Sequence, residues 1–130
     1  MSVQNGNLPG GNGGGILNAG ALTVTNSVIS GNAAQYGGGI LNQDGALNVA
    51  SSVFVSNSAS FDGAGINSAG TLVISDSVFT GNVAQGLGGG VIVAGGMLTV
   101  INSAFSGNWA FSEFAGGAGM LVMNSTASIN

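Results

Sequence analysis

Apolar and polar residues alternate in short segments that recur along the chain in a fixed order. Four of these segments span 22–24, 47–49, 72–74 and 98–100. Alternation over so few residues predicts a short strand with one buried face. Aligning the segments places their apolar residues in two columns, namely Leu22, Leu47, Leu72 and Leu98, and Val24, Val49, Ile74 and Val100.

A second block begins with serine and ends with asparagine, and it occurs five times. The copies start at Ser2, Ser27, Ser52, Ser77 and Ser103, in steps of 25, 25, 25 and 26 residues. This alignment predicts an apolar column made of Ile29, Phe54, Phe79 and Phe105. In the first copy, Gln4 occupies the same position and interrupts the column. It also predicts a turn column of asparagines whose side-chain amides hydrogen-bond along the stack, made of Asn32, Asn57, Asn82 and Asn108.

A glycine-rich block followed by an apolar residue lies between the other two. Its five copies end at Ile16, Ile40, Ile66, Val91 and Met120. Each copy falls at the same phase of the repeat, which favours a structural role over a flexible linker. We therefore expect tight corners whose backbone needs positive φ or close approach.

Three short strands per period cannot bury an apolar face alone, so successive periods must stack on one another. Stacking at the strand spacing of about 4.8 Å places each residue over its equivalent one period away. The abundance of Gly, Val, Ser, Thr and Asn disfavours a helical solenoid. The sequence predicts an all-β chain with one domain over residues 1–130, a right-handed parallel β-helix (β-solenoid) of about five coils of roughly 25 residues.

The pairing of a glycine-glycine-isoleucine block with a phenylalanine-to-asparagine block, as in 38–40 with 54–57, points to a known family. It resembles the repeats of chlamydial polymorphic outer-membrane proteins and related bacterial β-helix surface adhesins. The resemblance covers nearly the whole chain. It implies a right-handed parallel β-helix on the cell surface, used for adhesion or display.

Charge is nearly absent from the chain. It has no Lys, Arg, His or Cys, its acids are Asp44, Asp62, Asp76 and Glu113, and its net charge is −4. Without cations nothing neutralises phosphate, so we expect no nucleic-acid binding and no attraction to anionic lipid. Residues 1–11 do not have the pattern of a signal peptide, and no apolar run of about 18 residues predicts membrane insertion.

The acids do not form a pattern that predicts catalysis. Glycoside hydrolysis needs two carboxyl groups about 5 to 9.5 Å apart, and no two acids share a column on adjacent coils. Asp62 and Asp76 are expected to be turn residues. The sequence thus predicts a protein that is not an enzyme and has no cofactor and no metal site, with a carbohydrate-active module as a distant alternative. An ice-binding face is equally distant, because the column that begins with Thr23 continues with Asn48 and Val73.

The last period contains an aromatic insertion at 109–115, with Trp109, Phe111 and Phe114. One interpretation is a bulge that folds back on its own coil beside the corner residues Tyr36 and Phe61. The other is a lateral contact patch for a partner, such as a surface receptor or a glycan, because insertions in repeat proteins often map to binding loops. Both interpretations stay open at this point.

The two ends predict self-association. A solenoid leaves open β-edges, and neither end shows a helix, an edge proline or a lysine that would block pairing. Residues 127–130 align with 22–25, and the Ser2 block follows them in phase, which favours a head-to-tail homopolymer. The predicted stacking interface comprises Ser2, Val3, Gln4, Asn7, Ser128, Ile129 and Asn130. We expect an extracellular or cell-surface fibre subunit, with a segment of a bacterial surface adhesin as the alternative.

Overall fold

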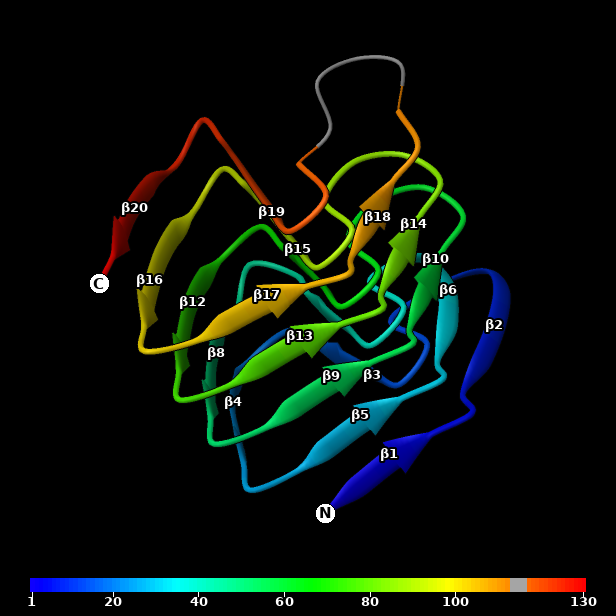
Figure 1. Cartoon of the computed structure of the whole chain (residues 1–130), viewed down its shortest axis with the longest axis horizontal. Coiled ribbons are helices and arrows are strands. Elements are labelled where there is room, and N and C mark those ends of the chain that lie inside the picture. The colour runs from blue at the N-terminus through cyan, green and yellow to red at the C-terminus, as the bar shows by residue number, and fades with distance from the viewer. Residues whose placement is uncertain (113–116) are drawn as a thin grey trace.

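The chain winds into a right-handed parallel β-solenoid (Figure 1). The computed structural model describes residues 1–112 and 117–130, and within them it contains twenty strands and no helix. Each of the five coils has four strands, so equivalent strands of successive coils form four parallel sheets. The predicted fold class and the number of coils are confirmed.

The sheets are numbered here in the order in which the chain meets them. Sheet 1 comprises β1 (Ser2–Gln4), β5 (Val28–Ser30), β9 (Val53–Val55), β13 (Val78–Thr80) and β17 (Ala104–Ser106). Sheet 2 comprises β2 (Asn7–Asn12), β6 (Ala33–Tyr36), β10 (Ser58–Ala59), β14 (Val83–Ala84) and β18 (Trp109–Ala110). Sheet 3 comprises β3 (Ile16–Asn18), β7 (Ile40–Asn42), β11 (Ile66–Ser68), β15 (Val91–Ala94) and β19 (Met120–Met123). Sheet 4 comprises β4 (Ala21–Thr25), β8 (Ala46–Ala50), β12 (Thr71–Ser75), β16 (Met97–Ile101) and β20 (Thr126–Ile129).

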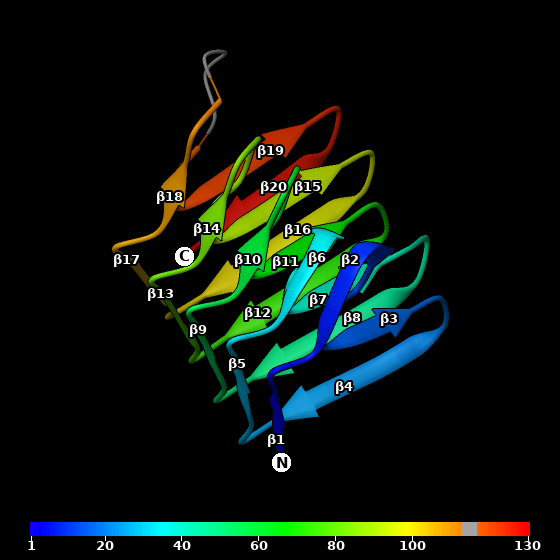
Figure 2. The same ribbon diagram turned by 90° about the vertical axis from the view of Figure 1, so that its right-hand side faces the viewer.

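Equivalent strands of successive coils stack along the solenoid axis (Figure 2), and their register places like residues over like residues. In sheet 4, Leu72 pairs with Leu47 and Leu98, and Ile74 pairs with Val49 and Val100. These side chains point inward and form one continuous core with the sheet 1 and sheet 3 columns. The predicted apolar columns are therefore confirmed, those of sheet 4 in coils one to four and that of sheet 1 in coils two to five.

Four strands per coil correct the sequence prediction of three. The strands that the sequence pattern missed are those of sheet 2, of which β10 and β14 are two residues long. Their inward residues are the small Ala34, Ala59 and Ala84, all buried. Because alanine adds little to an apolar pattern, this sheet does not stand out as alternation in the sequence.

The first coil is shifted by one residue from the predicted alignment. Val3 pairs with Ile29, and Gln4 pairs with Ser30 at the surface. Val3, rather than Gln4, therefore heads the apolar column of sheet 1, and the prediction that Gln4 interrupts it is wrong. A one-residue slip exchanges the two faces of a strand, and this register keeps the Gln4 amide out of the core.

Buried asparagines form a continuous hydrogen-bonded ladder at the turn after sheet 1, as predicted. The Asn57 Nδ2 donates to Asn82 Oδ1 at 2.9 Å, and Asn82 Nδ2 donates to Asn108 Oδ1 at 2.9 Å. Each amide also donates to a carbonyl one coil back, as from Asn82 Nδ2 to Phe54 O at 3.0 Å. The shifted first coil places Gly6, not Asn7, below Asn32, with the Gly6 N–H donating to Asn32 Oδ1 at 2.8 Å.

The aromatic column of sheet 1 packs face to face in the centre of the solenoid. The Phe54 and Phe79 ring centroids lie 4.6 Å apart, and those of Phe79 and Phe105 lie 4.8 Å apart. This spacing equals the strand spacing of a sheet, so the rings stack without distorting the coils.

The glycine blocks form corners, as expected. Gly37 has a φ of 64°, in the left-handed region. A Cβ on the next residue, Gly38, would meet the Ser58 carbonyl oxygen and lie 2.7 Å from that of Ala64. These blocks thus let the backbone pass closely between neighbouring coils.

Candidate functional site: the two end coils and the flank of sheet 2

The described acids serve as turn residues. The Asp62 carboxylate accepts a hydrogen bond from the Leu87 N–H at 2.7 Å, and the Asp76 carboxylate accepts one from Asn102 Nδ2 at 2.6 Å. Asp44 and Asp76 have φ values of 55° and 48°, which favour Asp, Asn and Gly at turns. Glu113 lies outside the described residues. Within residues 1–112 and 117–130 there is no group of three or more His, Cys, Asp or Glu side chains that could hold a metal ion.

The C-terminal end of the solenoid leaves its core columns uncovered. Phe105, Met120 and Val122 are only half-buried, although their equivalents one coil back are fully buried. Ile129, the last member of the Val24 column, is 62% exposed. This end therefore presents a strip of apolar side chains next to the free edges of the last coil.

The N-terminal end is more closed. Val3, Ile16 and Leu22 are half-buried at the first ends of their columns. Val24, in the same column as Ile129, is only 1% exposed. The first coil thus leaves less of its core open to solvent than the last coil does.

The edge strand β2 of the first coil carries two features that oppose further pairing. It contains Pro9, which has no N–H to donate, and its register against β6 shifts between Leu8 and Asn12. An edge proline and a bulge are common ways of preventing edge-to-edge association. The expectation that neither end has an edge proline is therefore wrong for this end.

The polar ladders also differ at the two ends. At the C-terminal end, Asn108 and Ser103 occupy ladder positions with the same side chains as the coils below. At the N-terminal end the equivalent positions are Gly6 and Met1, which lack the amide and hydroxyl groups. In coils three to five, the ladder side chains accept hydrogen bonds from the coil before them. The first coil has no such side-chain oxygens at these positions, so it could not accept the same bonds from a coil placed before it.

The predicted stacking residues lie at opposite ends of the molecule and in different sheets. Ser2, Val3 and Gln4 form β1, and Asn7 begins β2, in the first coil; Ser128 and Ile129 lie in β20 of the last coil, followed by Asn130. Because β1 belongs to sheet 1 and β20 to sheet 4, a stack that continued every sheet would place β1 on β17 and β4 on β20. It would join Val3 to Phe105 and Val24 to Ile129.

Sequence reasoning left out the half-buried apolar residues at both ends, namely Phe105, Met120, Val122, Ile16 and Leu22. The signal was present for all but Val122, because each of the others is the first or last member of a repeated apolar column. The column of Val122 begins with Asn18, Asn42 and Ser68 and is not apolar throughout. The sequence prediction joined residue 130 of one copy to the first residues of the next, following the order of residues along the chain. It did not consider which sheet each end strand belongs to, so these residues were left out.

Two aromatic rings project from the flank of the last coil. Trp109 is 61% exposed and Phe111 is 57% exposed, and their ring centroids lie 6.3 Å apart with an interplanar angle of 21°. Trp109 pairs with Val83 of β14, so it continues an outward column of sheet 2. The corner residues Tyr36 and Phe61 form a separate stacked pair at 5.3 Å. Phe114, the third predicted contact residue, lies outside the described residues.

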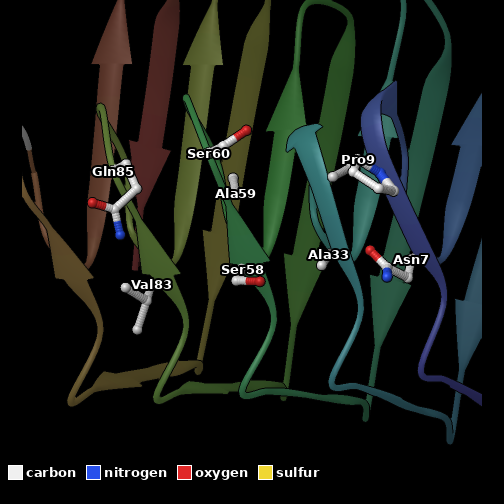
Figure 3. A pocket seen from close by; sticks show the side chains of 9 residues that line it. Asn7, Pro9, Ala33, Ser58, Ala59, Ser60, Val83 and Gln85 are labelled. Carbon is white, nitrogen blue, oxygen red and sulfur yellow. The ribbon is translucent and has the colours of Figure 1, made fainter.

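Sheet 2 also carries a shallow groove of about 280 Å³ on its outer face (Figure 3). Small side chains in the second and third coils form its centre, and larger ones stand at its two ends. The residues that shape it are Asn7, Pro9, Ala33, Ser58, Ser60 and Gln85.

No helix in the described ranges has the length and apolarity needed to cross a membrane. Comparison of the chain with protein-family models, with curated protein sequences and with solved structures finds no match.

Proposed function

We propose that this β-solenoid is a structural subunit of an extracellular fibre, assembled by end-to-end stacking of copies. The observation that carries the proposal is the open C-terminal end, where Ile129 is 62% exposed and Phe105, Met120 and Val122 are only half-buried. Covering these side chains with another coil removes apolar surface from water. The free edge of the same coil offers backbone groups that a further parallel strand pairs with.

The first coil of another copy has matching apolar positions. In a stack that continues the sheets, Val3 lies on Phe105, Ile16 on Met120 and Val24 on Ile129. Five coils at about 4.8 Å each give an axial repeat of roughly 24 Å per subunit. Such a heterologous contact does not close on itself and so produces a filament.

The polar features of the first coil limit the strength of this contact. Gly6 and Met1 would meet Asn108 and Ser103 without continuing their ladders. Pro9 and the bulge in β2 oppose pairing in sheet 2. Sheets 1, 3 and 4 would therefore form the junction, and the association would depend on protein concentration.

The composition supports a structural role rather than a catalytic one. A net charge of −4 on 130 residues produces little repulsion between subunits in line. Asp62 and Asp76 each accept a hydrogen bond from the next coil, and the described residues of the hollows that contain them include no second carboxylate. We propose no enzymatic activity and an extracellular or cell-surface location.

The test is the size of the particles formed by the wild type and by end variants. The N–H groups of Thr126 and Asn130 donate to carbonyls of the preceding coil. Because successive N–H groups of a strand point to opposite sides, the Ile129 N–H points away from that coil. Ile129→Pro should therefore block the C-terminal edge without removing an internal hydrogen bond. Met97→Ala, which removes an exposed apolar side chain from the flank, is the matched control.

Sedimentation velocity and electron microscopy should show concentration-dependent filaments for the wild type and for Met97→Ala, and monomers for Ile129→Pro. A wild type that remains a monodisperse monomer at millimolar concentration would overturn the fibre proposal.

A second candidate function is a binding segment of a bacterial surface adhesin. It is favoured by the Trp109 and Phe111 pair, which projects from the flank rather than from an end. Exposed stacked aromatics are characteristic of contact sites. The two candidates differ in the surface used: Ile129→Pro affects the fibre, and Trp109→Ala affects the adhesin.

A further inference from the structure

We infer that the outer face of sheet 2 is a binding site for a neutral oligosaccharide chain. The site combines the groove shaped by Asn7, Pro9, Ser58 and Gln85 with the adjoining rings of Trp109 and Phe111. This inference does not need end-to-end assembly, and it assigns a ligand class to the flank.

The groove follows the solenoid axis across the outward columns of sheet 2. One column runs through Asn7, Ala33, Ser58 and Val83, and the other includes Ser60 and Gln85. Figure 3 shows Asn7 and Pro9 at one end, Val83 and Gln85 at the other, and the small side chains between them. The hollow spans four coils, which is about 14 Å at the strand spacing. Its shape therefore suits an extended chain rather than a compact ligand.

The aromatic pair stands at the C-terminal end of the same two columns. Trp109 follows Val83 in the strand register. The Phe111 N–H donates to Ala84 O, as the Gln85 N–H donates to Ala59 O, so Phe111 follows Gln85. A ligand lying along the groove thus reaches two exposed rings without changing direction.

The chemistry of this face selects a ligand that is neutral and rich in hydroxyl groups. None of the side chains named for the groove or the ring pair is charged. The amides of Asn7 and Gln85 both donate and accept hydrogen bonds, and so do the hydroxyls of Ser58 and Ser60. Aromatic faces pack against apolar C–H surfaces, and sugar rings combine such surfaces with hydroxyls at their edges.

Other ligand classes fit less well. A peptide adding a strand needs free backbone groups, but the interior strands of sheet 2 use theirs to pair with both neighbours. Anionic polymers need cations, and the chain has no Lys or Arg. A purely apolar ligand would leave the Gln85 and Ser60 polar groups without partners.

The test uses Trp109 as the probe, because it is the only tryptophan in the chain. Neutral cello-, chito-, xylo- and galacto-oligosaccharides of about three to five sugars, on the order of the length of the groove and the adjoining rings, are titrated into the full chain. Tryptophan emission and heats of binding are measured. At least one series should shift the emission and bind more tightly as the chain lengthens. Oligogalacturonate, as the anionic counterpart, should bind at least tenfold more weakly.

Two variants locate the site without changing the core. Trp109→Ala removes the ring and should weaken calorimetric binding at least tenfold. Ser58→Phe fills the centre of the groove from an exposed position and should abolish binding while leaving the Trp109 ring in place. Phe61→Ala, which removes an exposed ring from a different corner, should bind like the wild type.

The inference is overturned if no neutral series binds at millimolar concentration, or if Ser58→Phe binds as the wild type does. It is also overturned if Trp109→Ala changes only the sedimentation of the protein, since the flank would then be a contact between copies. Repeating the titrations with Ile129→Pro, which should remain a monomer, separates these results from end-to-end stacking.

Discussion

The first and last coils have the same architecture but differ in the exposure of the core column that runs through sheet 4. Val24 in the first coil is 1% exposed, whereas its equivalent in the last coil, Ile129, is 62% exposed. The first coil also contains an edge proline, a register shift in β2, and Gly6 in place of a ladder asparagine. The last coil retains both ladder side chains, Ser103 and Asn108.

This difference shows that a repeat does not make its two ends equivalent. Each coil of a parallel solenoid depends on the next for its apolar packing and its ladder acceptors. The N-terminal coil has residues that reduce this dependence, and the C-terminal coil does not. Covering the C-terminal coil would therefore bury more apolar surface than covering the N-terminal coil, and substitutions at equivalent positions should have different effects.

The largest expected effect is on the aromatic column. Phe79→Asp would bury an unpaired charge between Phe54 and Phe105, and we expect it to abolish folding. Phe105→Asp, in the same column at the open end, should keep the fold with a lower melting temperature, because that position is only half-buried. Circular dichroism and thermal melting compare the two. Equal effects would show that the last coil is as enclosed as the interior.

The next effect concerns the asparagine ladder. The Asn57 side chain donates to Ile29 O and Asn82 Oδ1 and accepts from the Asn32 N–H and Nδ2. Asn57→Ala should cost about 3 kcal/mol in the free energy of unfolding, because buried partners lose their bonds. Asn108→Ala, at the ladder end, should cost about 1 to 2 kcal/mol, since no coil lies above it. Urea unfolding of both variants measures the difference, which should vanish if the last coil is covered in solution.

A smaller effect is expected from removing the block at the N-terminal edge. Pro9→Ala restores an N–H to β2 and should increase filament formation by a few fold at equal concentration. Sedimentation velocity measures the change. A decrease, or no change in a protein that does form filaments, would show that Pro9 does not limit the contact.

The smallest effect is expected from Asp44 and Asp76, which lie in neither end coil. Asp44→Asn and Asp76→Asn keep side chains that tolerate positive φ, so each should change the free energy of unfolding by less than about 0.5 kcal/mol. A stability change above 1 kcal/mol, or the loss of any hydrolytic activity found in a glycan screen, would contradict a turn-only role.

Much of the fold could be predicted from the order of the residues. The columns that include Leu47, Ile74 and Phe79 were correct because a parallel solenoid places equivalent residues one period apart, and the same column then recurs at a constant step. The asparagine ladder followed from the same periodicity, and so did the corner at Gly37.

Tertiary structure alone decided three features. Sheet 2 escaped the pattern because its inward residues, such as Ala59, are small. The register of the first coil depended on burying Val3 instead of Gln4, a choice that packing makes and a repeat alignment does not. The exposure of Ile129 and the groove beside Ser58 depend on which coil covers which, because burial is a property of neighbours in space.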